Sequence, residues 1–194
     1  MFKLEFTECV KLFNSGNIFD AEINAKLLVN KYPDQFELFN LLALISVKIE
    51  KFDQAILYFN KCLEINESSS DIYFNLGLIY KKKNNFYLSI KNYKKAIKLK
   101  KDFLEAYINL AVVCKLNGCF DEAIENYKQV IRLKPDYLEA YNNLGIIYGE
   151  IRKFKEASDC FKKIKLTNKK FYDAYFNESF ILDRKSTRLN SSHI

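Results

Sequence analysis

Four asparagines stand at one fixed spacing along the chain, and their side chains are suited to binding another polypeptide. They are Asn75, Asn109, Asn143 and Asn177, each 34 residues after the one before. A primary amide offers both a hydrogen-bond donor and an acceptor, so a row of amides can match the peptide groups of an extended segment regardless of its side chains. We therefore take these four residues as candidate ligand-binding residues, with a protein or peptide as the partner.

A row of acidic residues keeps the same spacing and precedes each asparagine of the row by four residues. Its members are Glu37, Asp71, Glu105, Glu139 and Asp173. Acidic side chains in the first turn of a helix are stabilised by the helix dipole by about 0.3–1 kcal/mol. This structural role is the favoured interpretation of the row, although the same charges would also attract basic ligand segments.

Positive charge dominates the composition, with a formal net charge of +7. The excess gathers in one stretch, at Lys81, Lys82, Lys83, Lys91, Lys94, Lys95, Lys98, Lys100 and Lys101. Proteins that bind single-stranded nucleic acid combine such charge with exposed aromatic side chains. Here most tyrosines and phenylalanines recur at regular apolar positions, so a solvated lysine-rich face is favoured and weak nucleic-acid binding is the alternative.

Residue types for catalysis or metal binding do not cluster in this sequence. The only histidine is His193, the pair Cys114 and Cys119 has no second cysteine pair nearby, and the five glycines form no phosphate-binding loop. We therefore expect no catalytic activity, no cofactor and no metal. The five cysteines are expected to be reduced thiols that pack as small apolar side chains.

The spacing of these residues is the period of the whole chain. Aligned blocks share a motif, which reads Tyr73-x2-Leu76-Gly77, Tyr107-x2-Leu110-Ala111 and Tyr141-x2-Leu144-Gly145. Extending the alignment gives blocks 2–35, 36–69, 70–103, 104–137 and 138–171, and a partial block 172–182. This pattern resembles the tetratricopeptide repeat, a helical hairpin of 34 residues.

The resemblance implies a fold and a binding mode. Each block would form two antiparallel helices of roughly 14 residues, and the blocks would stack into an all-α, right-handed solenoid of about five and a half repeats. In this family the first helices line a concave groove, and the sixth repeat position, which holds the four asparagines, points into it. The array is similar to the asparagine ladder of the nucleocytoplasmic O-linked N-acetylglucosamine transferase. Asparagine is also common at this position throughout the family. The second interpretation is therefore that these asparagines reflect a residue preference of the repeat and bind no ligand.

The turn inside each block should fall at repeat positions 15 and 16. The five pairs are Gly16-Asn17, Glu50-Lys51, Asn84-Asn85, Gly118-Cys119 and Arg152-Lys153. Glycine and asparagine tolerate the left-handed backbone that ends a helix, so three of the five turns are well specified locally. The turns that begin at Glu50 and Arg152 must depend on packing.

The end of the chain departs from the repeat. We expect residues 183–194 to be a disordered, non-native tail, since 184–193 resembles translated sequencing-adapter read-through. In that case the natural protein continues, and the rival to a binding scaffold is the N-terminal fragment of a larger, glycosyltransferase-like enzyme. The sequence shows neither a transmembrane stretch nor a signal-peptide layout, so we expect a cytoplasmic location without membrane association. It does not indicate an oligomeric state.

Overall fold

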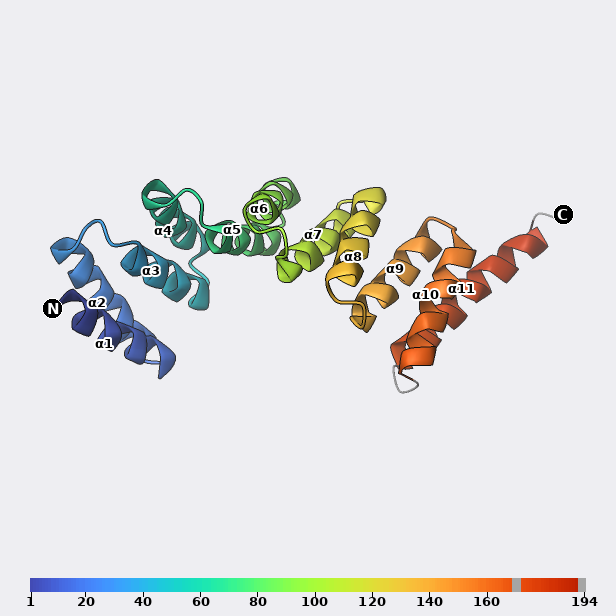
Figure 1. Cartoon of the computed structure of the whole chain (residues 1–194), viewed down its shortest axis with the longest axis horizontal. Helices are drawn as coiled ribbons and strands as arrows, with labels where there is room; N and C mark the ends of the chain where they lie inside the picture. Colours follow the sequence, from blue (N-terminus) through green and yellow to red (C-terminus); the bar gives the residue numbers. More distant parts are fainter. Residues whose placement is uncertain (169–171, 192–194) are drawn as a thin grey trace. The chain divides into compact units, whose positions relative to one another are not determined.

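The computed structural model describes residues 1–168 and 172–191, with 182–191 described by their backbone (Figure 1). In these residues the secondary structure is entirely helical. The helices are α1 (Phe2–Asn14), α2 (Ile18–Lys31), α3 (Phe36–Lys48), α4 (Phe52–Ile65), α5 (Ser70–Lys82), α6 (Phe86–Leu99), α7 (Leu104–Leu116), α8 (Phe120–Leu133), α9 (Leu138–Glu150), α10 (Phe154–Thr167) and α11 (Tyr172–Ser191). None of the described helices is long and apolar enough to cross a membrane.

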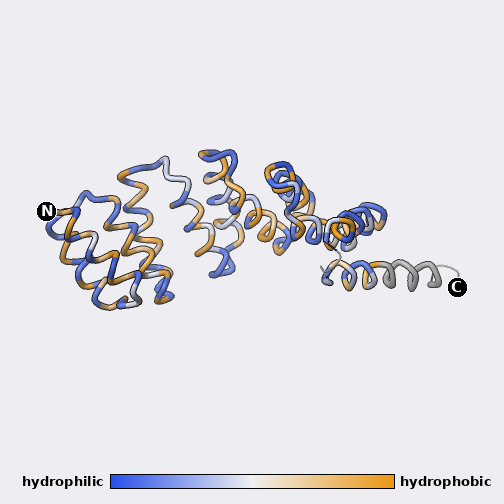
Figure 2. The backbone as a smooth tube through the Cα atoms, turned by 60° about the horizontal axis from the view of Figure 1, so that its bottom comes forward, coloured by the Kyte–Doolittle hydropathy of each residue, from blue (hydrophilic) through white to orange (hydrophobic). Residues whose placement is uncertain are grey.

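Consecutive helices form antiparallel pairs, one pair for each predicted block, so the expected all-α solenoid fold is confirmed. The first helix of each complete pair has 13 residues and the second has 14. Along each helix, apolar and polar residues alternate at the helical period (Figure 2). The chain divides into two compact units, Met1–Lys100 with α1 to α6 and Lys101–Ile194 with α7 to α11.

The turns inside the pairs share one backbone geometry. The residue in the left-handed region is Gly16, Glu50, Asn84, Gly118 or Arg152, with φ between 56° and 88°. The next residue then donates its amide hydrogen to a carbonyl five residues earlier, as Asn17 does to Leu12 at 2.9 Å and Lys51 does to Ser46 at 2.8 Å. This is the bond of a Schellman-type helix end. The turns therefore lie where the sequence predicts them.

Within a pair, the eighth repeat position packs against the twenty-fourth. A Cβ added to Gly77 would lie 2.5 Å from the ring of Tyr93, and one added to Gly145 would lie 2.6 Å from the ring of Phe161. The first pair reverses the sizes, with Cys9 at the eighth position and Ala25 at the twenty-fourth, and both are fully buried. This exchange explains how α1 and α2 keep the pair geometry without the aromatic residue.

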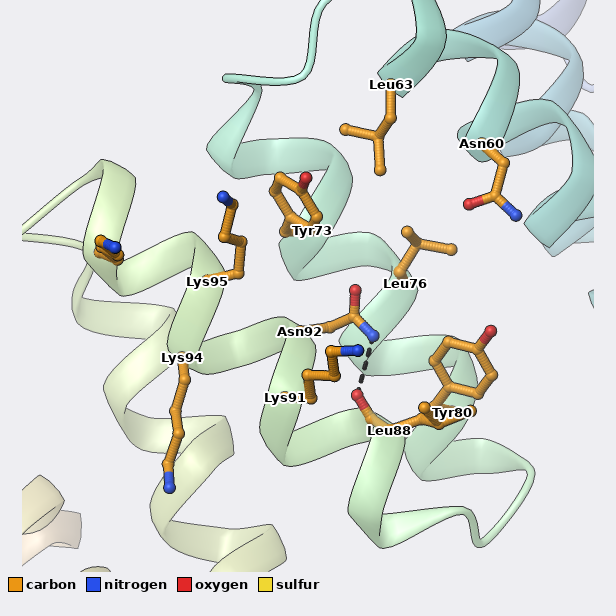
Figure 3. A pocket seen from close by; sticks show the side chains of 11 residues that line it. Asn60, Leu63, Tyr73, Leu76, Tyr80, Leu88, Lys91, Asn92, Lys94 and Lys95 are labelled. Carbon is orange, nitrogen blue, oxygen red and sulfur yellow. Dashed lines mark hydrogen bonds between the residues drawn. The ribbon is translucent and has the colours of Figure 1, made fainter.

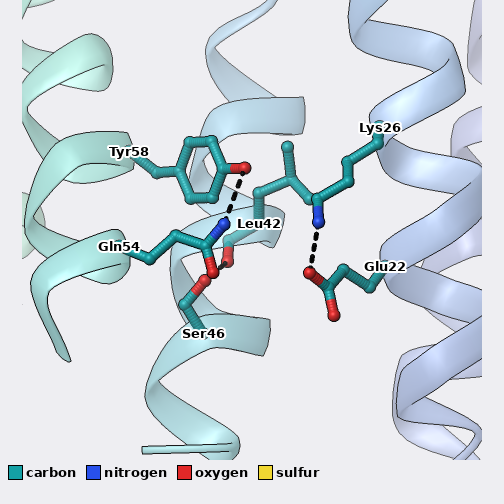
Figure 4. A network of polar contacts seen from close by, with 6 residues as sticks. All are labelled: Glu22, Lys26, Leu42, Ser46, Gln54 and Tyr58. Carbon is teal, nitrogen blue, oxygen red and sulfur yellow. Dashed lines mark hydrogen bonds and ion pairs between the residues drawn. The ribbon is translucent and has the colours of Figure 1, made fainter. Parts of the chain in front are cut away.

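The second pair replaces another aromatic position, the eleventh, with Ser46. This side chain is buried, and its hydroxyl donates a 2.8 Å hydrogen bond to the Leu42 carbonyl one turn earlier (Figure 4). The same view shows Lys26 paired with Glu22 on α2, and Gln54 donating to the Tyr58 hydroxyl on α4 at 3.4 Å. The buried hydroxyl is thus satisfied within its own helix.

The last helix runs further than the sequence predicts. We expected the ordered repeat to end at residue 182 and residues 183–194 to be disordered, but α11 continues to Ser191. Residues 183–191 contain neither glycine nor proline, the two residues that most disfavour a helix. Residues 192–194 lie outside the described residues, and the non-native origin of 184–193 stays a prediction.

Candidate functional site

The four candidate asparagines lie at equivalent places on four first helices. Asn75 is on α5, Asn109 on α7, Asn143 on α9 and Asn177 on α11, and all four side chains are half-buried. In the second pair the equivalent residue is Leu41, which is 4% exposed and belongs to the core. The row of amides therefore begins at α5, as the sequence indicates.

Asn75 lines a cavity of about 210 Å³ between α3 and α5 in the first unit. Leu44 and Val47 of α3 and Leu78 of α5 supply its apolar wall. The ammonium of Lys82, which also lines the cavity, lies 5.4 Å from the ring centre of Phe52 at the start of α4. The cavity is thus an apolar socket with an amide in its wall and positive charge beside it.

Asn177 lines a cavity of about 220 Å³ between α9 and α11 in the second unit. Ile146 of α9 and Phe176 and Phe180 of α11 form its apolar part. The Asn177 side-chain amide donates a 3.0 Å hydrogen bond to the Asn142 side-chain oxygen. The charge beside this cavity differs from the charge beside the first one. Glu150 lines it, and the Glu150 carboxylate pairs with the Lys115 ammonium at 3.3 Å.

The two cavities occupy the same place in the repeat. Leu44, Leu78, Ile146 and Phe180 all hold the ninth repeat position, and Asn75 and Asn177 both hold the sixth. Each cavity lies between consecutive first helices and combines ninth-position side chains from both with one amide. Such a socket can hold an apolar side chain while its amide bonds a peptide group.

The other two asparagines are placed differently. Asn109 donates a 2.9 Å hydrogen bond to the Glu105 carbonyl one turn earlier in α7. Asn143 is half-buried on α9. The structure therefore brings two of the four predicted residues into sockets. Sequence reasoning missed the ninth-position residues, although an apolar residue at Leu44, Leu78 and Ile146 recurs with the same period.

The acidic row lies in the first turn of five first helices, and all five side chains are exposed. These residues are Glu37, Asp71, Glu105, Glu139 and Asp173. Their place agrees with stabilisation of the helix dipole.

The cysteines are free thiols. Cys9, Cys62 and Cys114 are buried, Cys160 is half-buried and Cys119 is exposed on a turn. Among the described residues no group of three histidine, cysteine, aspartate or glutamate side chains could hold a metal ion.

Sequence profiles of known families match most of the helix pairs. The profile described as "Tetratricopeptide repeat" matches residues 70–103, and a second profile with the same description matches 36–69 and 138–170. A profile described as "TPR repeat" matches 114–151. These helix pairs are tetratricopeptide repeats (TPRs). The first three matched segments follow the predicted blocks to within one residue.

Solved TPR structures share the fold along most of their lengths. The crystal structure of MamA protein is 25% identical, covers 87% of this chain and 92% of its own, and has a TM-score of 0.80. YrrB, described as "a TPR protein with an unusual peptide-binding site", is 17% identical, with 90% of each chain covered and a TM-score of 0.79. Pseudomonas aeruginosa pilF is 12% identical, covers 99% of this chain and 87% of its own, and has a TM-score of 0.74. The curated proteins contain no match to this sequence.

Proposed function

We propose that this TPR protein is a non-catalytic scaffold that binds an extended segment of a partner protein along the first helices of its repeats. The observation that carries this proposal is the recurrence of one socket. The same repeat positions enclose a cavity beside Asn75 in the first unit and beside Asn177 in the second. Recurrent sockets on a repeating backbone suit a ligand that is itself periodic, as an extended peptide is.

Each socket is large enough for a side chain of the ligand. The cavities measure about 210 and 220 Å³, and an apolar cavity of about 150 Å³ accommodates benzene. Branched aliphatic or aromatic side chains therefore fit. The walls already contain leucine, isoleucine and phenylalanine side chains, so burial of such a group removes apolar surface on both partners from water.

The free-energy contributions expected for each contact indicate a moderate affinity. Burying one large apolar side chain contributes about 1.5–3 kcal/mol, and each amide bond to a peptide group contributes about 0.5–1.5 kcal/mol. Ordering a flexible ligand costs about 2–5 kcal/mol of that gain. We therefore expect dissociation constants in the micromolar range for a single segment.

The fold supports the proposed kind of ligand, a peptide, but not the individual binding residues. YrrB has the same fold and is described as having a peptide-binding site, so helix pairs stacked in this way can host one. Its sequence is too distant to transfer residues. The assignment of Asn75 and Asn177 rests on the cavities they line in this chain.

The test begins with peptides selected against the whole chain from a display library. The best peptide is then measured against the variant Asn75→Ala/Asn177→Ala, which we expect to bind about two-fold or more weakly, since the socket that holds the peptide loses its amide bond. The matched control is Asn30→Ala, an exposed amide on α2. Circular dichroism must show equal helicity for all variants.

A second variant separates the two interpretations of the asparagine row. In Asn109→Ala/Asn143→Ala we expect capture to weaken several-fold if the ligand spans the row, while helicity stays intact. If neither double variant changes the affinity, asparagine at this position is a residue preference of the repeat without a role in binding, and the proposed site is wrong.

A further inference from the structure

A cavity larger than the sockets lies on the other side of the third repeat in the first unit. It measures about 610 Å³ and lies between α4 and α6, with α5 as its floor (Figure 3). Leu63 of α4 forms part of one wall, and Tyr73, Leu76 and Tyr80 of α5 form the apolar floor. The α6 wall is different, because it presents lysines. We call this cavity the α4–α6 groove.

The charge of α6 sets it apart from the equivalent helices. Its 14 residues contain four lysines and no acidic residue. Every other second helix carries at least two acids within its sequence. In α4 and α8 lysines are paired within the helix, Lys61 with Glu64 and Lys128 with Glu125, each at 2.7 Å. Helix α6 therefore has no acidic residue of its own to pair with Lys91, Lys95 or Lys98.

Three of these lysines face the α4–α6 groove along one side of α6. Lys91, Lys95 and Lys98 are four and three residues apart, which places them on one helix face over about 10 Å. Lys95 lies over the ring of Tyr73, with its ammonium 5.6 Å from the ring centre. Within the described residues none of the three forms an ion pair. Lys94 also lines the groove, but its side chain runs in a different direction from those of Lys91 and Lys95 (Figure 3).

We propose that the α4–α6 groove binds an extended acidic segment of a partner protein, in which carboxylates alternate with apolar side chains. Carboxylates supply the charge that α6 lacks. Lys91 and Lys95 are separated by about 6 Å along the helix axis. In an extended chain, side chains on one face recur every 6.6–6.8 Å or so, which is close to that separation. The intervening side chains then face the apolar floor and Leu63.

The arrangement favours carboxylates over nucleic acid. A nucleic-acid strand needs aromatic faces on which bases stack. Tyr73 and Tyr80 are half-buried in the floor, and Lys95 already covers the Tyr73 ring. The lysines also form a line instead of converging on one point, so they suit successive separate charges better than a single phosphate group. The groove is formed by α4, α5 and α6, whereas the proposed peptide sockets lie between first helices.

The experiment uses the full chain and a fluorescein-labelled peptide in which three glutamates alternate with two leucines. Fluorescence anisotropy should show saturable binding that weakens as sodium chloride is raised. The variant Lys91→Gln/Lys95→Gln should bind about five-fold or more weakly, since two charge contacts are lost. Glutamine keeps the helix propensity of lysine, and circular dichroism checks that α6 is intact.

The repeat offers a matched control. Lys163 of α10 holds the same repeat position as Lys95, so Lys162→Gln/Lys163→Gln makes the same charge change outside the groove. We expect this variant to bind within about two-fold of the parent chain. The variant Asn75→Ala/Asn177→Ala is measured with the same peptide, and loss of binding there but not in Lys91→Gln/Lys95→Gln would assign the peptide to the sockets and overturn this proposal. Failure of this proposal is thus distinguishable from failure of the proposed peptide sockets.

With the parent chain and the lysine variants, four outcomes would overturn the inference. They are no saturable binding of the alternating peptide, equal loss in the α10 control, equal affinity for a peptide of the same composition with its glutamates adjacent, and tighter binding of a single-stranded RNA oligonucleotide through Lys91 and Lys95. The last outcome would assign the groove to nucleic acid. Retained binding in Leu63→Ser would likewise contradict the role of the apolar wall.

Discussion

At the scale of single residues, Cys62 of α4 has an ionisation that folding suppresses. It is 0% exposed, and its thiol donates to the Phe36 carbonyl at the start of α3, within the same helix pair, at 3.7 Å. Burial penalises the thiolate and raises the pKa of Cys62 to about 12. In an unfolded chain a cysteine has a pKa of about 8.5. Folding and alkaline pH are therefore coupled through this side chain.

The sign follows from proton binding. Above about pH 8.5 the unfolded chain loses the Cys62 proton while the folded chain keeps it, so stability falls as pH rises. Between pH 7.5 and pH 10 we expect this thiol alone to lower the free energy of unfolding by about 2 kcal/mol. Cys160, whose pKa burial raises to about 11, adds to the loss in the same direction.

The variant Cys62→Ala isolates this effect, because alanine already occupies the equivalent position of α6 at Ala96. Urea unfolding in the presence of a reductant, repeated from pH 7.5 to pH 10, should show a shallower decline for Cys62→Ala than for the parent chain. Cys119→Ala, which removes an exposed thiol, is the control and should follow the parent. Parallel curves for all three proteins would show that Cys62 keeps its proton equally in both states.

Residue types and spacing could predict which residues share a place in the repeat, but not which of them enclose a cavity. The asparagines were found from their period, whereas the sockets depend on how a ninth-position side chain of one helix meets the next first helix. Leu44 and Leu78 face each other only once α3 and α5 are packed. The same holds for the α4–α6 groove. The sequence shows its lysines, but it does not show that apolar residues of α5 form a floor beside them.

At the scale of elements, the turns show how packing replaces local preference. Gly16 and Gly118 adopt the left-handed backbone at little cost, whereas Glu50 and Arg152 adopt it with a side chain, at φ of 59° and 65°. A residue other than glycine loses about 1–2 kcal/mol in this region. The hydrogen bonds that follow are the same in all five turns. The helix pairs therefore hold two turns in a conformation that their own residues disfavour.

Replacing Glu50 with glycine should stabilise the chain. Relief of the left-handed strain outweighs the entropy that glycine adds to the unfolded state, which is about 0.5–1 kcal/mol, so Glu50→Gly should gain about 0.5–1 kcal/mol. Arg152→Gly should behave in the same way. The measurement is the urea midpoint at constant slope.

The converse change tests the same reasoning. Gly118→Ala should lose about 1 kcal/mol, although nothing lies within 4 Å of the added Cβ, since the cost is conformational. If Glu50→Gly lowers the midpoint instead, the exposed side chain of Glu50 contributes more than the strained backbone removes.

The last helix extends beyond the partial block that the sequence predicts, since α11 continues to Ser191. Its change in composition after residue 182 suggested disorder, but composition alone does not end a helix. Residues 183–191 contain neither glycine nor proline, so the two residues that most disfavour a helix are missing from this stretch. The inner boundaries at Gly16, Asn84 and Gly118 were predicted well because each is fixed twice, by a turn residue and by the apolar residue that opens the next helix.

At the scale of the whole molecule, stability accumulates through contacts between adjacent elements. Within each of the two units, the strongest contacts among the described helices are within pairs and between one pair and the next. The cores follow this order, with one cluster spanning α1 to α3 and another spanning α3 to α5. A chain organised in this way is close to a one-dimensional array, in which each repeat depends on its neighbours. This organisation explains why a single period in the sequence was sufficient to predict the fold.

The first unit should therefore fold without the second. Residues 1–100 contain three complete helix pairs and two of these core clusters, and about three repeats are the minimum for a stable array. We expect a protein of residues 1–100 to be about four-fifths helical by circular dichroism and to unfold cooperatively. A fragment that is unstructured at neutral pH would show that helix formation in the first unit requires residues 101–194.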